Sequence, residues 1–88
     1  MPKFRKKPVE VEAIQWDGSN ESFQQILQLQ ETSNRKVMPH ENTLGVLIIP
    51  TLEGEMMANK NDWIIKGVSG EIYPCKPDIF ERTYDAVN

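Results

Sequence analysis

Cysteine and histidine side chains often supply a nucleophile, a base or a metal ligand, and this chain has one of each, Cys75 and His40. Lys76 follows Cys75, but neighbours on a strand point to opposite faces, so the lysine does not activate the thiol. We expect Cys75 to pack as a small, partly buried apolar residue. His40, near a predicted turn, is expected to be a surface residue without a role. A structural zinc site needs about four Cys or His ligands, so these two residues predict no metal centre.

Acidic side chains occur in close pairs, namely Glu10 with Glu12, Glu53 with Glu55, and Asp78 with Glu81. Acid–base hydrolysis needs two carboxyl groups whose surroundings separate their pKa values. The first pair shares one face of a predicted strand and the second flanks a turn, so we expect both to be solvated. The sequence contains no phosphate-binding loop, dinucleotide fingerprint, HExxH motif or EF-hand spacing. It therefore predicts a protein that is not an enzyme and holds no cofactor or metal.

Aromatic residues offer a different chemistry, because tryptophan and tyrosine are favoured at interfaces and as stacking platforms. Trp63 and Tyr73 lie on two predicted neighbouring strands, with charged residues close by in the sequence. The predicted binding residues are Trp16, Trp63, Lys66, Glu71, Tyr73 and Lys76. Such a surface suits a planar ligand or a protein partner. The alternative that Trp63 and Tyr73 only fill a small core stays open.

The N-terminal half predicts a strand followed by a helix. Residues 9–16 alternate apolar and acidic side chains until Ile14 and Trp16 fall on the acidic face. A bulge explains this change of face, and the alternative is a strand covered on both faces. A helix is expected from Ser19 or Asn20 to near Glu31, since Ser or Asn can cap its first turn. Its apolar stripe is Phe23, Ile26 and Leu27.

The second half predicts strands and turns. Short strands are expected at 36–38 and 55–58, and a central strand covered on both faces at 44–49, ended by Pro50. Turns are expected at 53–54 and 59–62. The clearest hairpin joins strands 63–66 and 71–73 through Gly67-Val68-Ser69-Gly70. A GxxG loop that clamps RNA joins two helices, so here it predicts only a tight turn. Residues 77–82 are expected to be helical, with Pro77 in the first position, and 83–87 to return as a strand.

The predicted fold class is therefore α+β: a small, twisted, mainly antiparallel β-sheet with one amphipathic helix packed on it and a short C-terminal helical turn. A length of 88 residues has room for a single domain, residues 1–88. One cysteine allows no internal disulfide and suits a reducing cytoplasm. Self-association is the most available extra source of stability, so monomer and homo-oligomer both stay open. A net charge of −3 argues against nucleic acid, and the lack of a long apolar run argues against a membrane.

The two ends of the chain, residues 4–16 and 62–84, resemble a family of small phage and prophage proteins without an established activity. That family starts with an R-K-K-P-V-x-[IV]-x-A-x-Q strand and ends in a G-D-[WY]-I-[IV]-x-G-x-x-G-E-x-Y-x-[CV] hairpin. The resemblance implies a phage or mobile-element origin and no catalytic residue. Asn61 stands where the family usually has glycine. Asparagine tolerates a left-handed backbone better than most residues, so we expect the turn to be kept.

The leading hypothesis is a non-enzymatic phage accessory protein that acts in the host cytoplasm by binding a host protein. Small phage proteins of this kind are often inhibitors or adaptors, including inhibitors of host defence, which is an argument by analogy. One alternative is a sponge for a nucleotide-type small molecule, with a pocket between protomers around Trp63, Lys66 and Tyr73. Another is a weak nucleic-acid binder that uses a basic N-terminal arm, made of Lys3, Arg5, Lys6 and Lys7.

Overall fold

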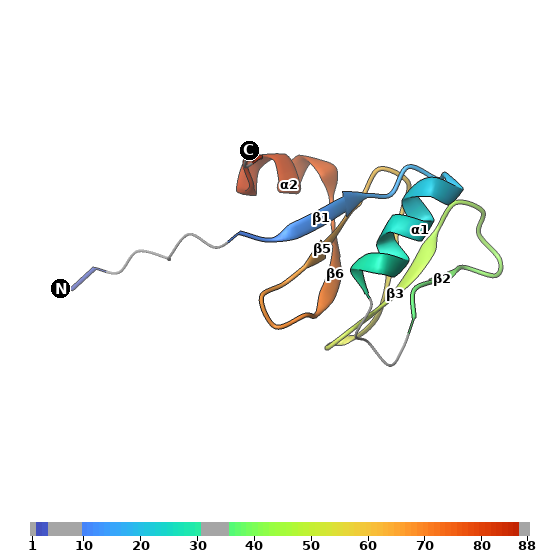
Figure 1. Ribbon diagram of the computed structural model, residues 1–88, viewed down its shortest axis with the longest axis horizontal. Coiled ribbons are helices and arrows are strands. Elements are labelled where there is room, and N and C mark those ends of the chain that lie inside the picture. The colour runs from blue at the N-terminus through green and yellow to red at the C-terminus, as the bar shows by residue number, and fades with distance from the viewer. Residues whose placement is uncertain (1, 4–9, 31–35, 87–88) are drawn as a thin grey trace.

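The structure is a computed structural model that describes residues 2–3, 10–30 and 36–86. Six strands and two helices follow one another along this part of the chain (Figure 1). In chain order they are β1 (Glu12–Gln15), α1 (Asn20–Leu29), β2 (Met38–Pro39), β3 (Leu47–Thr51), β4 (Gly54–Ala58), β5 (Trp63–Lys66), β6 (Ile72–Cys75) and α2 (Pro77–Thr83). The predicted α+β class is confirmed.

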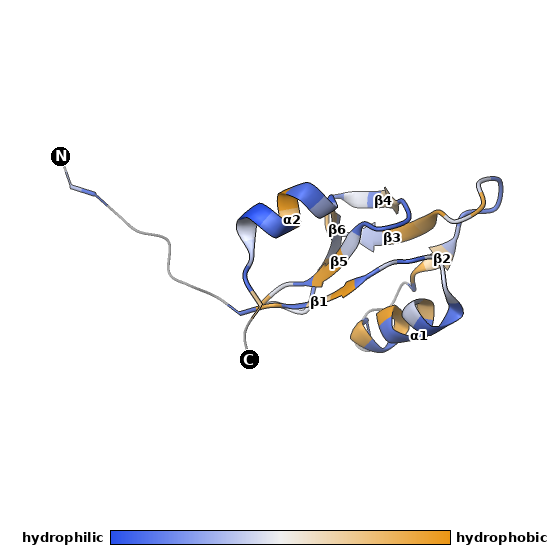
Figure 2. Ribbon diagram, turned by 90° about the horizontal axis from the view of Figure 1, so that it is seen from above, coloured by the Kyte–Doolittle hydropathy of each residue, from blue (hydrophilic) through white to orange (hydrophobic). Residues whose placement is uncertain are grey.

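The strands form two antiparallel three-stranded sheets, ordered β1-β5-β6 and β2-β3-β4, rather than a single sheet. β4 and β5 follow each other in the chain but do not pair, because the turn at 59–62 carries the chain from one sheet to the other. β6 contacts both β3 and β4, so the two sheets pack on each other there. Figure 2 shows α1 on one side of the strands and α2 on the other.

The main core lies between α1 and the inner faces of the two sheets. Its buried members are Trp16, Ile26, Leu29, Val37, Leu47, Ile49, Ala58, Ile64 and Ile72. Burial of side chains such as Ile and Leu contributes about 1.5–3 kcal/mol each. This core orients both sheets, and therefore fixes which strand faces and edges are left exposed.

β1 pairs with β5 in an uninterrupted register over residues 12–15, so the predicted bulge is wrong. The second explanation of the apolar pattern holds instead. Ile14 packs against the main core, while Ala13 pairs with the fully buried Ile65 on the opposite face. Both faces of β1 are therefore covered toward its end, and no extra residue is needed to turn Ile14 inward.

Helix α1 begins as predicted, because the Ser19 hydroxyl accepts a hydrogen bond from the Ser22 N–H at 3.1 Å. Its buried face includes Ile26 and Leu29, with Phe23 packed alongside. The helix ends at Leu29, two residues before the expected end; Glu31 lies outside the described residues. The Gln30 side chain then accepts a hydrogen bond from the Val37 N–H at 2.7 Å and so fixes where β2 begins.

β3 is the central strand of its sheet, as predicted, but its bounds and its burial differ from the prediction. Leu44 is fully exposed in a turn, because Gly45 adopts a positive φ of 81° and delays the start of the strand to Leu47. Pro50 does not end the strand, which continues to Thr51. Only one face of β3 is fully buried, since Ile48 on the other face is partly exposed.

The C-terminal elements form largely as predicted. The turn at residues 67–70 joins β5 to β6, and the Gly67 N–H donates to the Glu71 carbonyl at 2.7 Å. Pro77 occupies the first turn of α2. The predicted final strand is wrong for the described residues: Thr83 belongs to α2, residues 84–86 form no strand, and Val87 lies outside the described part.

Candidate functional site

The predicted aromatic pair lies under helix α2. Trp63 and Tyr73 share the face of the β5–β6 pair that α2 covers, since Tyr73 pairs with Ile65, two residues from Trp63. The Phe80 ring stacks on Trp63 with 4.2 Å between ring centroids and 8° between planes. Phe80 and Tyr84 also stack, at 5.1 Å. These rings form a small aromatic layer between α2 and the sheet, so Trp63 and Tyr73 serve packing first.

Polar groups at this layer differ in how they are satisfied. Partial burial and a hydrogen bond to Tyr84 raise the pKa of the Tyr73 hydroxyl to about 12. The indole N–H of Trp63 and one carboxylate oxygen of Glu71 are buried, and neither has a hydrogen-bond partner within the described residues. A Cβ at Gly67 would overlap the Glu71 carboxylate, so glycine leaves room for that side chain.

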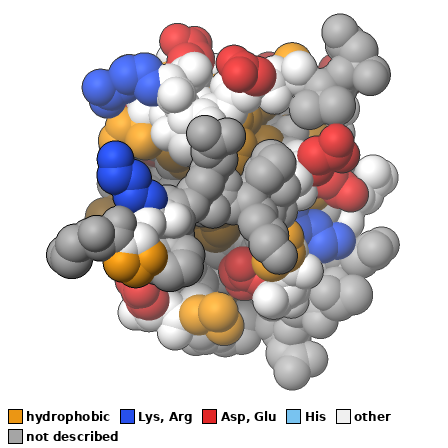
Figure 3. Space-filling view, turned by 90° about the vertical axis from the view of Figure 1, so that its left-hand side faces the viewer, with side chains coloured by type: hydrophobic (Ala, Val, Ile, Leu, Met, Phe, Trp, Pro, Cys, Tyr) orange, Lys and Arg blue, Asp and Glu red, His pale blue; other side chains and the backbone are white. Residues whose placement is uncertain are grey.

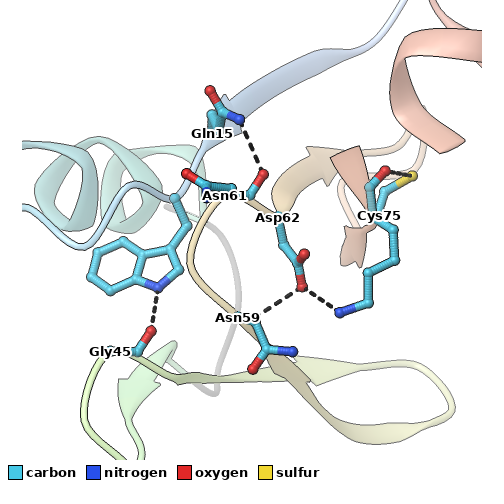
Figure 4. A network of polar contacts seen from close by, with 8 residues as sticks. Gln15, Gly45, Asn59, Asn61, Asp62 and Cys75 are labelled. Atoms are coloured by element: carbon cyan, nitrogen blue, oxygen red, sulfur yellow. Dashed lines mark hydrogen bonds and ion pairs between the residues drawn. The ribbon is translucent and has the colours of Figure 1, made fainter. Parts of the chain in front are cut away.

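The two predicted lysines do not join the aromatic pair. The Lys76 ammonium donates to the Asp62 carboxylate at 3.0 Å, and the Asn59 N–H donates to the same oxygen at 2.9 Å (Figure 4). The Asp62 side chain is only 4% exposed, whereas that of Lys76 is 53% exposed. Lys66 points away from the Trp63 face, because alternate strand residues point to opposite sides.

Trp16 lies in the main core, apart from the other predicted site residues. It is buried, and its indole N–H donates to the Gly45 carbonyl at 2.8 Å (Figure 4). Its ring meets Phe23 edge to face, with 6.4 Å between centroids. The hydrogen bond between Trp16 and Gly45 ties the end of β1 to the loop before β3, so Trp16 holds the two sheets together.

The residues considered for catalysis have structural surroundings. Burial, followed by the charges of Asp62 and Asp78, raises the pKa of the Cys75 thiol, which disfavours the reactive thiolate. His40 Nδ1 accepts a hydrogen bond from the Asn42 N–H at 3.1 Å within its loop. All six carboxylates of the three sequence pairs belong to exposed residues. No cluster of three or more His, Cys, Asp or Glu side chains suited to a metal occurs in the part of the chain that the structure describes.

An open cleft of about 320 Å³ lies between β1 and the start of α1. Its walls include Ile14, Asp17 and Ser22. The hydroxyls of Ser19 and Ser22 and the Ser19 N–H stabilise the Asp17 carboxylate and lower its pKa to about 2. The Ser22 hydroxyl donates to that carboxylate at 2.7 Å. The polar groups of the cleft thus serve to start the helix.

Sequence reasoning missed an exposed apolar surface on the β2-β3-β4 sheet. Met38 pairs with Ile48, and Ile48 pairs with Met57, so the three side chains form one row across the sheet. Met38 is 60% and Met57 61% exposed, and Ile48 between them is partly buried. We call this row, Met38, Ile48 and Met57, the methionine face. Leu52, at the tip of the β3–β4 hairpin, is 86% exposed.

A signal for this surface is present in the sequence. Met56 and Met57 are adjacent on a strand, so their side chains point to opposite faces and both are buried only if something covers each side. The structure covers neither side fully, and Met56 is 44% exposed. On the face drawn in Figure 3, the described side chains are mixed, with cationic, acidic and apolar groups side by side.

The chain matches no protein-family model, no curated protein and no solved structure. None of the helices in the described ranges is long and apolar enough to cross a membrane.

Proposed function

We propose that this chain is a non-enzymatic phage or prophage accessory protein that binds a host protein through its methionine face, in the host cytoplasm. The observation that carries the proposal is the exposure of Met38 and Met57 on either side of Ile48. Covering apolar surface gains about 25 cal/mol per Å². Methionine is unbranched and polarizable, so it adapts to the shape of a partner.

The rim of the methionine face indicates the chemistry of the partner. Glu53 and Glu55 are exposed on the β3–β4 hairpin, and Glu55 lies two residues from Met57 on the same strand face. Neither carboxylate takes part in an ion pair within the described residues. The expected partner therefore presents an apolar centre beside lysine or arginine side chains.

The catalytic alternative has little support from the geometry. A thiol with a raised pKa is a poor nucleophile, and Cys75 has no histidine beside it, since His40 bonds within its own loop. The exposed carboxylates lack the burial that separates the pKa values of an acid and a base. Binding of a protein partner needs neither a reactive thiol nor a pair of carboxyl groups with separated pKa values.

The two rival binding functions are less favoured. A nucleotide sponge needs an open aromatic face, but Phe80 already stacks on Trp63 and Lys66 lies on the other side of the sheet. A nucleic-acid arm would use Lys3, Arg5, Lys6 and Lys7, of which only Lys3 is among the described residues, and the net charge of −3 argues against it. The phage origin rests on the sequence resemblance. The left-handed conformation of Asn61 supports it, because the family usually has glycine there.

The first test is native mass spectrometry of the protein purified gently from cells that carry the phage. We expect a stoichiometric complex with one host protein. The same purification with the double variant Met38→Lys/Met57→Lys is expected to lose that protein, because two charges would be buried in the contact. Val68→Lys is the matched control, since Val68 is 75% exposed on the β5–β6 turn, which belongs to the other sheet.

Each outcome decides between the candidates. Added mass of a few hundred daltons in place of a protein would favour the nucleotide sponge. A host protein that stays bound to the double variant would contradict the methionine face as the binding surface. Binding lost equally in Val68→Lys would show that the loss is not specific to this face.

A further inference from the structure

Within the described ranges, β4 is an edge strand with one unpaired side, because its sheet has the order β2-β3-β4. Thr51 and Gly54 close a two-residue turn, and the Thr51 hydroxyl also donates to the Gly54 carbonyl at 2.6 Å. In a two-residue hairpin the closing residues exchange backbone hydrogen bonds, and bonded and non-bonded pairs then alternate. Met56 therefore directs its backbone groups toward β3, whereas Glu55 and Met57 direct theirs to the open side.

Pro50 agrees with this alternation. It pairs with Glu55, a position at which β3 directs no N–H toward β4. The N–H that proline lacks would point toward the β2 side, where β2 pairs only with Leu47 and Ile48. The hairpin thus accepts proline without losing a bond, and the outward direction of the Glu55 and Met57 backbone groups follows from the same register.

Two other sheet edges carry a proline where β4 carries none. Pro74 lies on edge strand β6, opposite Ile64, and Pro39 lies on the two-residue edge strand β2, opposite Leu47. The registers place both prolines at positions that face away from the neighbouring strand. Proline there removes the outward N–H that an added strand would need. β4 keeps the outward N–H groups of both Glu55 and Met57.

We propose that the open edge of β4 binds an extended segment of the partner protein by strand addition, with a lysine or arginine of that segment beside Glu55. This inference rests on the proposed function and names how the partner binds. The alternating donors and acceptors at the edge are matched by another β-strand. The apolar side chains of the added strand would continue the methionine face, and its cation would pair with the exposed carboxylate.

A second copy of this chain fits the edge less well. Antiparallel pairing aligns outward-facing residues with one another, so Glu55 would meet Glu55, Met57 or Asn59 of the other copy. None of these is a cation. Lys60 would lie opposite Glu55 only in a register in which outward-pointing backbone N–H and C=O groups of one copy face residues whose backbone groups point inward in the other. That register forms no ladder of hydrogen bonds. Self-pairing therefore leaves the carboxylate without a counter-charge.

The test uses the whole protein and a synthetic heptapeptide, Thr-Thr-Val-Thr-Lys-Thr-Thr with blocked ends, whose valine and lysine lie two residues apart on one strand face. Binding is followed by amide hydrogen exchange in NMR spectra. At saturation we expect exchange at the Glu55 and Met57 amides to slow by about tenfold, with no change at Met56, which already bonds to β3. Met57→Pro is expected to abolish peptide binding, because it removes an outward N–H without touching the β3 ladder. Met57→Thr, which keeps the N–H, is expected to retain it.

Charge supplies a second readout. Glu55→Gln is expected to weaken binding of the lysine peptide by about two- to fivefold at low salt, and to leave a peptide with glutamine in place of lysine unaffected. Equal affinity of the two peptides for the unsubstituted protein would contradict a cation beside Glu55.

Three results would overturn strand addition. They are no binding at millimolar peptide, equal binding by Met57→Pro, and protection of the Glu55 and Met57 amides by concentration alone, which would assign the edge to a second copy. The proposed function fails separately. A host protein lost from Met38→Lys/Met57→Lys but kept by Met57→Pro would leave protein binding intact and reject strand addition. Peptide binding without any captured host protein would support strand addition and contradict the proposed function.

Discussion

The Trp63 and Phe80 rings lie almost parallel, 8° apart in plane and 4.2 Å apart between centroids. This stack joins the start of β5 to helix α2, which presents no fully buried residue of its own. A seven-residue helix is too short to be stable in isolation. Its position on the sheet therefore depends on this contact and on the hydrogen bond between Tyr84, at the end of α2, and Tyr73 of β6.

Phe80→Ala is expected to lower the free energy of unfolding by about 2 kcal/mol, because it removes a half-buried ring and its stacks on Trp63 and Tyr84. Urea unfolding followed by far-ultraviolet circular dichroism measures this change. Ile79→Ala is the control on the same helix; Ile79 is 47% exposed, so we expect a loss of less than about 0.5 kcal/mol. Equal losses in the two variants would mean that the stack does not hold α2.

In the Asp62–Lys76 contact, loss of the Asp62 side chain is expected to destabilise the fold more than loss of the Lys76 side chain. Asp62→Ala removes a buried carboxylate that accepts from both the Asn59 N–H and the Lys76 ammonium, and should cost about 2–3 kcal/mol. Lys76→Met should cost about 1 kcal/mol or less, because that ammonium is half-exposed and water can replace it. The exposed pair Arg82–Asp78, at 3.7 Å, is the control, and Arg82→Met should change stability by less than about 0.5 kcal/mol. Urea unfolding of the three variants tests this order, and a larger loss for Lys76→Met than for Asp62→Ala would reverse the interpretation.

Asn61 has a φ of 79°, in the left-handed region where a β-branched residue is strained. Asn61→Val is expected to lower the free energy of unfolding by about 1–2 kcal/mol, and Asn61→Gly to leave it unchanged or raise it slightly. Guanidinium unfolding of the two variants gives the comparison. Asn59→Val serves as the control in the same turn, since Asn59 has no positive φ. If Asn61→Gly were the more damaging substitution, the role of backbone conformation at this position would be refuted.

Local signals in the sequence predicted the elements that depend on neighbouring residues. Ser19 caps α1, Pro77 opens α2, and glycines close the 67–70 turn, as expected. These features are fixed by hydrogen bonds and backbone angles within a few residues, so they require no knowledge of the rest of the fold. The turn at Asn61 was predicted for the same reason.

The errors concern what lies against each strand. The alternation around Ile14 fits either a bulge or burial on both faces, and only the position of α2 decides between them. Pro50 was read as a strand end because a sequence does not reveal which side of its strand is unpaired. The methionine face was missed on the same ground: Met38 and Met57 are far apart in sequence and meet only through their pairing with Ile48. Long-range pairing therefore determines the candidate site.

Ionisation of the Tyr73 hydroxyl is expected to lower the stability of the fold at alkaline pH. Its pKa is raised in the folded chain from the ordinary value of 10.0 to about 12, first by burial and then by the hydrogen bond to Tyr84. A group whose pKa is raised by folding stabilises the fold below its unfolded pKa. That contribution is lost as the pH rises from about 10 toward 12. Urea unfolding at a series of alkaline pH values should therefore show falling stability across this window.

Tyr84→Phe separates the two causes of this shift, because it keeps the ring that stacks on Phe80 and removes only the hydroxyl. We expect the pKa of Tyr73 to move part of the way back toward 10.0, since burial still acts, and the alkaline loss of stability to become smaller. Ultraviolet titration of tyrosinate absorbance measures the pKa, and Tyr73→Phe assigns the signal. A Tyr73 pKa that stays near 12 in Tyr84→Phe would show that burial alone sets it.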